Sequence, residues 1–498
     1  MKILSAQQIR ECDAHTIANE PISSLDLMER ASNAFVEAFL SKVTSENKQV
    51  SIFCGTGNNG GDGLAVARLL SEKGWKVDCY LVAFSDKISP DNQKNQERLS
   101  KMSMTLRIIK TASDFPDNIY ATVIDALVGT GITRPLEGLL GEVVHKINQQ
   151  KCTVFSVDLP SGLYDQDDCT VNINNIIRAD YSFTFQSPKH NFLLPEYAEV
   201  VGEWGVLDIG LDQAFIDQLE TDSHFIDRSL VQSFLLPRKK HSHKGTHGHA
   251  ALVCGSKGMM GAAVLATEAC LRSGVGLTTV MAPEIGYSIL QSTCPEAMCL
   301  VVGNTHWRNV PVVQKYTCLG IGPGLGQDSE TKEALLLTLE SCEKTVVLDA
   351  DALNLLSESD LSLLPKNSII TPHPKEFERL FGTTQNSHQR IDLARKKAKE
   401  YQAIILLKGH HSCIVLPNGN SYFNSTGNPG MAKGGSGDVL TGLITGLVAR
   451  GYSSKHASII GCYLHGLAGD ICAGEIGMEG MTPKDLASFI PRAWQVLA

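Results

Sequence analysis

The chain has 498 residues, which is too long for one ordinary hydrophobic core, so two or three domains are expected. Its 43% hydrophobic and 19% charged residues are typical of a globular protein, and a net charge of −9 argues against a nucleic-acid partner. The 14 Cys include no C-x-x-C pair, which disfavours a zinc ribbon or a disulfide framework and favours reduced thiols in the cytoplasm.

The ends of the chain and its apolar stretches give no sign of a membrane segment. Met1 to Gln8 turns polar at once and lacks the apolar core of a signal peptide. The longest apolar stretch, Val439 to Ala449, is interrupted by Gly and Thr and is too short to span a bilayer. No membrane partner is therefore expected.

The first half alternates short apolar strands with amphipathic helices. Because strands that alternate with helices form parallel sheets covered on both faces, this half is expected to be a Rossmann-like three-layer α/β sandwich. The expected strands are Gln49–Cys54, Val77–Ala83, Val123–Leu127 and Thr153–Val157, with a helix at Gly63–Lys73.

The regular pattern weakens over Asp212–Lys240, and the domain boundary is placed there. Beyond it the pattern restarts, which predicts a second α/β sheet. Its expected elements are a helix at Ala262–Ser273, strands at Ala250–Cys254, Leu319–Gly320, Val346–Leu348, Ser368–Ile370 and Ile404–Leu407, and a hairpin that turns at Pro417–Asn420.

A glycine-rich run follows the first strand. Gly55, Gly57 and Gly60 satisfy G-x-G-x-x-G, the spacing that lets backbone amides approach a pyrophosphate at a helix N-terminus. Between a strand and a helix this pattern favours a dinucleotide site over a merely tight turn. The dense run Asn58–Asp62 adds a carboxylate where a pyrophosphate prefers no anion, which indicates a different role.

Two further strands end in Asp, in VIDALVGTG and VDLPSG. The carboxyl ends of parallel strands share one crevice, so Asp62, Asp125 and Asp158 are expected to converge there, although each taken singly is equally compatible with a turn cap. Clustered carboxylates raise one another's proton affinity, which suits one of them to acid/base work. The oxygen donors of Asn59, Asp125 and Ser161 suit an alkali or alkaline-earth ion better than zinc.

These runs, GNNGGDG, DALVGTGITRP and VDLPSG, resemble NAD(P)H-hydrate epimerase over residues 1–215. The resemblance implies that Asp158 is the acid/base and that Asn59, Asp125 and Ser161 bind K⁺. It also implies substrate contacts at Asn58, Asn59, Gly60, Gly61, Asp62, Gly129, Thr130, Gly131, Ile132, Thr133, Arg134, Pro135 and Asp158.

A second glycine-rich run, NPGMAKGGSGD, precedes a helix expected to begin near Val439. Small residues let successive amide N–H groups face inward at a helix N-terminus, which makes an anion hole for a phosphoryl group. Asp438 lies beside that hole. A lone Asp at a helix start is more often a cap, but the GGSGD context favours a catalytic base.

Together with GSKGMMGAA, GPGLG, DADALN, TPHP and LKG, this run resembles ADP/ATP-dependent NAD(P)H-hydrate dehydratase, a ribokinase-like α/β domain, over residues 225–498. The resemblance implies that Ala263, Gly324, His373 and Asp438 contact the hydrate, with Asp438 catalytic. It implies that the nucleotide is bound by Lys408, Gly409, His410, His411, Ser412 and Gly437. Lys375, Thr246 and Lys433 depart from the family pattern, which puts substrate affinity in doubt but not the reaction.

The combined resemblance implies a bifunctional repair enzyme. It would epimerise the R and S hydrates NADHX and NADPHX and dehydrate the S form, with K⁺, Mg²⁺ and ADP, or ATP in its place, and with release of AMP and phosphate. A homo-oligomer is expected. One alternative is a vitamin-precursor kinase with a fused regulatory domain, and another is a nucleotide-sensing protein without catalysis. The two intact acids, Asp158 and Asp438, argue against both.

Overall fold

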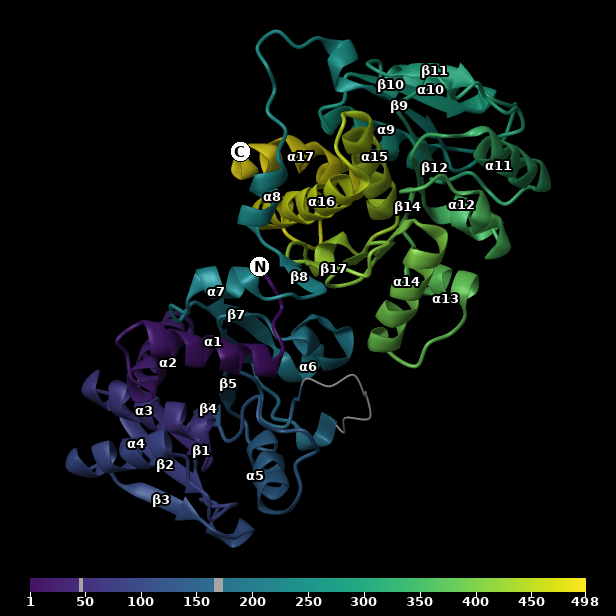
Figure 1. The fold of residues 1–498 in the computed structure, drawn as a ribbon. Helices are drawn as coiled ribbons and strands as arrows, with labels where there is room; N and C mark the ends of the chain where they lie inside the picture. The colour runs from purple at the N-terminus through teal and green to yellow at the C-terminus, as the bar shows by residue number, and fades with distance from the viewer. Residues whose placement is uncertain (44–47, 165–172) are drawn as a thin grey trace. The chain divides into compact units, whose positions relative to one another are not determined.

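The computed structural model describes residues 1–43, 48–164 and 173–498 (Figure 1). It divides into two compact units: a first unit of Lys2–Thr221, and a second of Asp222–Ala498 together with Met1. The division after Thr221 falls inside the stretch where the sequence pattern weakens. Each unit is built on its own sheet.

The first unit has a seven-stranded parallel sheet in the order β3-β2-β1-β4-β5-β6-β7. The order reverses direction between β1 and β4, so the loops after these two strands part and leave a crevice at the carboxyl edge. The strands are β1 (Gln49–Cys54), β2 (Lys76–Val82), β3 (Leu106–Ile109), β4 (Thr122–Ala126), β5 (Thr153–Val157), β6 (Tyr181–Phe185) and β7 (Glu203–Leu207).

Helices cover both faces of this sheet (Figure 1). One apolar cluster joins the sheet to α2 and α3 through Phe35, Phe39 and Leu64, and the other joins it to α5 through Val143 and Ile147. The expected Rossmann-like three-layer arrangement is thus confirmed. The helices are α1 (Ala6–Asn19), α2 (Ser24–Lys42), α3 (Asn58–Glu72), α4 (Pro90–Lys101), α5 (Gly138–Asn148), α6 (Ala198–Val201) and α7 (Gln213–Gln218).

The second unit has a ten-stranded sheet in the order β11-β10-β9-β12-β13-β14-β15-β16-β17-β8, with its reversal between β9 and β12. It is parallel except around β16, which pairs antiparallel with both neighbours and forms the expected hairpin. The strands are β8 (Ser223–Ile226), β9 (His249–Val253), β10 (Leu277–Ala282), β11 (Met298–Val301), β12 (Cys318–Ile321), β13 (Val346–Leu348), β14 (Ile369–Ile370), β15 (Ile404–Leu407), β16 (Cys413–Val415) and β17 (Ser421–Asn424).

The main core of the second unit lies where α9, α15, α16 and α17 pack on the sheet, through buried residues such as Ala266, Leu443 and Ile460. The helices are α8 (Arg228–Phe234), α9 (Met260–Arg272), α10 (Tyr287–Thr293), α11 (Ser329–Ser341), α12 (Ala350–Leu355), α13 (Pro374–Phe381), α14 (Ser387–Tyr401), α15 (Ser436–Ala449), α16 (Ser454–Ile476) and α17 (Pro483–Leu497).

Two helices begin earlier than their apolar periodicity predicts. The first helix of the βα unit starts at Asn58 rather than Gly63, and α15 starts at Ser436 rather than near Val439. Each extra turn consists of small or polar residues, which carry no apolar stripe. Both glycine-rich runs therefore enter the first turn of a helix instead of ending in a loop.

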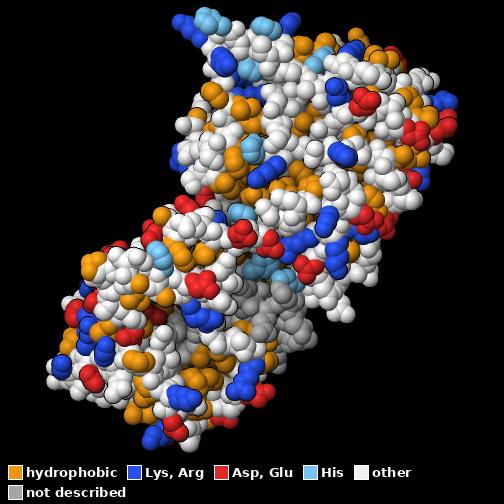
Figure 2. All heavy atoms as spheres, viewed as in Figure 1, with side chains coloured by type: hydrophobic (Ala, Val, Ile, Leu, Met, Phe, Trp, Pro, Cys, Tyr) orange, Lys and Arg blue, Asp and Glu red, His pale blue; other side chains and the backbone are white. Residues whose placement is uncertain are grey.

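The surface and the cysteines add two facts. Figure 2 shows Lys and Arg side chains interspersed with Asp and Glu on the face that it draws. The cysteines in the described ranges are free thiols. Among the same residues, none of the helices combines the length and the apolar character that crossing a bilayer requires.

Candidate active sites

In the first unit, α3 begins close to the end of β1 because its first turn carries no side chains on that side. A Cβ added to Gly60 would lie 1.9 Å from the carbonyl oxygen of Gly55, so any larger residue would push the helix away. Asn59, on the same turn, is buried, and its Nδ2 has no hydrogen-bond partner among the described residues. The amide of Asn59 is therefore available to a bound group.

Asp125, which lies within β4, is fully buried beneath the loop that follows β5. Its Oδ1 accepts hydrogen bonds from Ser161 Oγ at 2.6 Å and Leu127 N at 3.2 Å, and its Oδ2 accepts from Ser161 N at 2.8 Å and Ser156 Oγ at 2.9 Å. Burial raises the pKa of Asp125, and these hydrogen bonds oppose the rise. No Lys, Arg or His within the described ranges forms an ion pair with it.

Asp158 follows β5 and has a left-handed backbone, with φ of 67°, which Asp tolerates better than most residues. One carboxylate oxygen, Oδ1, receives three donors: Lys189 Nζ at 3.1 Å, Thr184 Oγ1 at 3.0 Å and Phe185 N at 3.2 Å. The Lys189 side chain is only 5% exposed and that of Asp158 is 15% exposed. These donors hold Oδ1 in place, and Oδ2 accepts no hydrogen bond from the described residues.

Two more carboxyl groups surround Asp158. Burial raises the pKa of Asp62 well above its ordinary value, and the negative charges of Asp158 and Asp13 raise it further. Burial likewise raises the pKa of Asp13, on α1, to about 6, with Asp158 adding to the rise and Lys189 opposing it. The structure thus brings Asp62 and Asp158 together as expected, and it adds Asp13 and Lys189, which sequence reasoning missed.

The loop after β4, which is expected to contact the substrate, packs against the rest of the first unit only at its start. Gly129 lies against α3, since a Cβ added to it would be 3.3 Å from the Asn59 side chain. Farther along, Gly131, Thr133, Arg134 and Pro135 are exposed, whereas Thr130 and Ile132 are half-buried. The loop is therefore anchored at its start and open beyond it.

In the second unit, Asp438 lies in the first turn of α15, directly after the glycines that begin the helix. Burial raises its pKa to about 7; the negative charges of Asp349 and Asp351 add to the rise, and the positive charge of Lys408 opposes it. A carboxyl group with a pKa near neutrality can both accept and return a proton under physiological conditions. The expected catalytic base thus has the environment that such a role requires.

Lys408 and Asp349 form a buried ion pair beside this turn. Lys408 Nζ lies 2.6 Å from Asp349 Oδ1, and Thr441 Oγ1 donates to Asp349 Oδ2 at 2.7 Å. Glu376 Oε2 is 3.9 Å from the same ammonium. Although burial opposes it, the charge of Asp349 raises the pKa of Lys408, so this side chain is positively charged at neutral pH.

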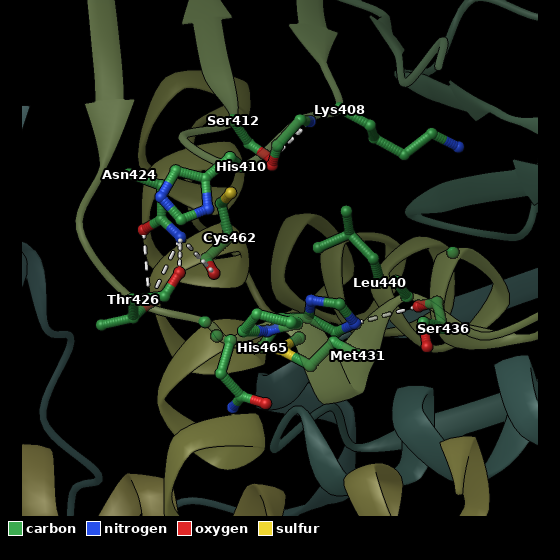
Figure 3. Close-up of a pocket in the computed structure, with 17 residues that line it drawn as sticks. Lys408, His410, Ser412, Asn424, Thr426, Met431, Ser436, Leu440, Cys462 and His465 are labelled. Carbon is green, nitrogen blue, oxygen red and sulfur yellow. Dashed lines mark hydrogen bonds between the residues drawn. The ribbon is translucent and has the colours of Figure 1, made fainter. Parts of the chain in front are cut away.

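A cavity of about 480 Å³ opens beside the N-terminus of α15 (Figure 3). This volume lies in the range of sites that hold nucleotide-sized ligands. Five of the six expected nucleotide residues line it: Lys408, Gly409, His410, Ser412 and Gly437. Other residues that line the cavity, beyond the expected nucleotide contacts, include Asn424, Thr426, Met431, Ser436, Leu440, Cys462 and His465.

The two histidines nearest this cavity differ in position. His411, the sixth expected nucleotide residue, does not line it: its Nδ1 lies 2.8 Å from the Asn424 carbonyl oxygen. His465, which is half-buried, lines the cavity (Figure 3), with Nε2 2.9 Å from the Ser436 carbonyl oxygen. Burial lowers the pKa of each ring to about 4, so both are neutral at physiological pH.

The three other residues expected to contact the hydrate differ in exposure. Ala263 is fully buried in the core, and Gly324, with φ of 61°, lies against Met259 and Ala262. His373 is exposed, and its Nδ1 accepts hydrogen bonds from the first backbone amides of α13. Only His373 therefore offers a side chain that projects from the protein surface.

The three residues that depart from the family pattern have unequal roles. Lys433 donates through Nζ to the carbonyl oxygens of Glu479 at 2.7 Å and Met481 at 2.5 Å, so it ties the GGSGD loop to the turn after α16. Thr246 and Lys375 are exposed. Lys433 thus supports the loop that carries Asp438.

Comparison with known proteins covers both units. Residues 24–191 match the family model described as YjeF-related protein N-terminus, and residues 250–492 match the model described as NAD(P)H-hydrate dehydratase. The bifunctional NAD(P)H-hydrate repair enzyme Nnr of Moorella thermoacetica is 36% identical over 99% of this chain and 96% of its own length. The chain belongs to the bifunctional NAD(P)H-hydrate repair enzyme family.

Other members and solved structures agree. The repair enzyme of Coxiella burnetii is 34% identical over 96% of each chain. An ADP/ATP-dependent NAD(P)H-hydrate dehydratase from Bacillus subtilis, co-crystallised with ATP and Mg²⁺, is 33% identical and covers 55% of this chain and 99% of its own, with a TM-score of 0.51. A ribokinase-like superfamily protein from Enterococcus faecalis is 28% identical over 56% of this chain and 98% of its own, with a TM-score of 0.52. The expected ribokinase-like fold is confirmed.

Proposed function

We propose that this chain repairs hydrated nicotinamide cofactors in two steps. The first unit interconverts the R and S epimers of NADHX and NADPHX, and the second dehydrates the S epimer with ADP. The observation that carries this proposal is the resemblance to bifunctional repair enzymes along nearly the whole chain, since it includes both units. The vitamin-precursor kinase alternative accounts for the second unit alone.

For epimerisation, Asp158 is the acid/base. The hydrate carries a hydroxyl group on the ring carbon next to nitrogen. In its protonated form, Asp158 gives a proton to this hydroxyl, which leaves as water while the nitrogen lone pair forms the C=N bond. Water then adds to either face of the planar cation and returns a proton to Asp158. Lys189 and Thr184 hold Oδ1 of Asp158 in place throughout.

We place the hydrate between the first turn of α3 and the loop after β4. Asn58, Gly60, Gly61 and Asp62 would contact it from the helix, and the expected contacts at residues 129–135 would close over it. Gly129 packs against Asn59, which supports a shared site for the two segments. The open end of the loop leaves room for the rest of the cofactor.

The first unit has a donor set that fits K⁺. Asp125 is a fully buried carboxylate with hydrogen bonds but without a cation partner among the described residues, and the side-chain oxygens of Asn59 and Ser161 are uncharged. Oxygen donors of this kind suit an alkali ion. Asn59, Asp125 and Ser161 would hold the ion, which would offset the buried charge beside the substrate.

For dehydration, Asp438 takes the proton from the hydrate hydroxyl as its oxygen attacks the terminal phosphoryl group of ADP. The P–O bond to the hydrate forms as the bond to AMP breaks, and backbone amides at the start of α15 stabilise the charge in transfer. The nitrogen lone pair then expels phosphate, and loss of a proton from the neighbouring ring carbon restores the dihydronicotinamide. Ala263, Gly324 and His373 are the proposed hydrate contacts.

The nucleotide is proposed to occupy the cavity beside α15, with Lys408 and Gly437 at its phosphates and Gly409, His410 and Ser412 along its length. Among the described residues no group of three His, Cys, Asp or Glu could hold a metal ion. Mg²⁺ is therefore proposed to arrive on the phosphate oxygens of the nucleotide.

The deciding experiment mixes the purified chain with both hydrate epimers, ADP, Mg²⁺ and K⁺, and follows the dihydronicotinamide absorbance. Full recovery is expected, because epimerisation continually supplies the S form. Recovery that stops when the S epimer is exhausted would contradict the first activity, and no recovery would contradict the second. Replacement of ADP by ATP measures the nucleotide preference, and replacement of NADHX by NADPHX measures the substrate preference. A cytoplasmic location and a homo-oligomeric state remain predictions, the latter tested by light scattering.

A further inference from the structure

Asp349 occupies an unusual place under the dehydratase site. It follows β13 and is 1% exposed, and its two carboxylate oxygens are divided between two elements. Oδ1 binds Lys408, which follows β15, and Oδ2 accepts from Thr441 of α15. This side chain is not used for capping, since as the N-cap residue of α12 it makes no side-chain capping bond.

The ion pair lies directly against the first turn of α15. A Cβ added to Gly437 would be 3.5 Å from Asp349 Oδ2 and 3.5 Å from Lys408 Nζ. Gly437 lines the cavity and precedes Asp438, so the ion pair touches the turn that is proposed to bind phosphate. A shift of the Asp349 carboxylate would therefore move both Lys408 and this turn.

We propose that Asp349 is a positioning residue for dehydration: its carboxylate holds the Lys408 ammonium and, through Thr441, the turn that carries Asp438 in one arrangement. This inference rests on the proposed function of the second unit. No residue role has been assigned to Asp349 by the motif resemblance. In this proposal Asp349 acts through its two neighbours, Lys408 and Thr441, and not by contact with substrate or nucleotide.

The charges around Asp438 allow a sharp test. Asp349 and Asp351 are negative, Lys408 is positive, and Glu376 faces Lys408 at 3.9 Å. Removal of the Asp349 charge lowers the pKa of Asp438, and removal of the Lys408 charge raises it. Since a base must be deprotonated to act, the acid limb of the pH–rate profile moves to lower pH in the first case and to higher pH in the second.

The experiment measures dehydration of the S epimer against pH for the wild type, Asp349→Asn, Lys408→Met and the double variant. We expect the limb to move down by about one pH unit in Asp349→Asn and up by about one unit in Lys408→Met. The KM for ADP should rise about tenfold in Asp349→Asn, because Lys408 is no longer held. Thr441→Val removes a hydrogen bond but no charge, so it should slow dehydration without moving the limb.

The double variant keeps the test decisive if Asp349→Asn alone fails to fold. It removes both members of the Lys408–Asp349 pair, so neither charge of that pair is left without its partner. Its limb is expected near that of the wild type, because the two opposite shifts cancel. A double variant with the same limb as Lys408→Met, or slower single variants with unmoved limbs, would overturn the inference. A wild type without nucleotide-dependent dehydration would instead contradict the proposed function.

Discussion

The two proposed catalytic acids, Asp158 and Asp438, have different surroundings. Asp158 in the first unit has one oxygen bound by three donors, including the buried ammonium of Lys189. The carboxylate of Asp438 in the second unit receives no hydrogen bond from the described residues, and burial and neighbouring charges dominate its environment. Hydrogen bonds thus fix the orientation of Asp158, whereas burial and neighbouring charges set the pKa of Asp438. Epimerisation should therefore be sensitive to substitution of the donors, and dehydration should be sensitive to pH.

The largest effect is expected when each acid is replaced by its amide. Asp438→Asn should reduce dehydration about a thousandfold, because an amide cannot take the hydroxyl proton, and it should leave epimer exchange intact. Asp158→Asn should do the reverse. Both activities are measured on each purified variant, with dehydration followed on the pure S epimer. Loss of both activities to the same extent in either variant would refute separate sites.

Next in size is the loss of the lysine that orients Asp158. Lys189→Met should lower the rate of epimer exchange about a hundredfold, since the Asp158 side chain loses the donor that holds its Oδ1 in place. Thr184→Val, which removes an uncharged donor from the same oxygen, is the matched control and should cost about tenfold. Equal rates for Lys189→Met and the wild type would show that geometry does not govern this site.

The pH dependence of dehydration gives a smaller graded effect. Because the pKa of Asp438 is about 7, the base is increasingly protonated as pH falls below that value, and the rate of dehydration should fall about tenfold per unit below pH 6. Single-turnover measurements of the S epimer at saturating ADP would follow this directly. A rate that stays constant down to pH 5 would mean that Asp438 is not the base.

The smallest effect concerns the support of the GGSGD loop. Lys433→Met removes hydrogen bonds to the carbonyl oxygens of Glu479 and Met481. We expect about 1 kcal/mol lower unfolding free energy and a KM for ADP about threefold higher, with kcat nearly unchanged. Lys366→Met, at an exposed position, is the control. No difference between the two variants would show that the tether has no effect.

Much of the fold follows from the sequence because strands and glycine-rich turns have local signatures. The strands that flank both crevices were predicted to within a residue or two. The starts of α3 and α15 were not, because residues such as Asn58 and Ser436 carry no apolar periodicity that would mark them as helical.

Site residues could be predicted where a motif marks the end of a strand. Residues that interact with them from other parts of the chain could not. Asp125 and Asp158 end recognisable strands, whereas Lys189 follows β6, which was not anticipated, and Asp13 comes from α1. The same edge rule, applied after Tyr181–Phe185, would have pointed to Lys189. His465 shows another limit, because no motif in the sequence marks it as a residue that borders a cavity.

The close packing of α15 against α9 limits which substitutions this helix can accept. A methyl group at Gly442 would lie 1.9 Å from the carbonyl oxygen of Ala266, and one at Gly446 would lie 2.1 Å from Ser273 Oγ. Gly442 is one helical turn beyond Asp438, so a bulkier residue there would lift the helix and redirect the carboxylate with it. Directed evolution toward larger hydrates is therefore expected to succeed through the surrounding loops and to fail through this helix.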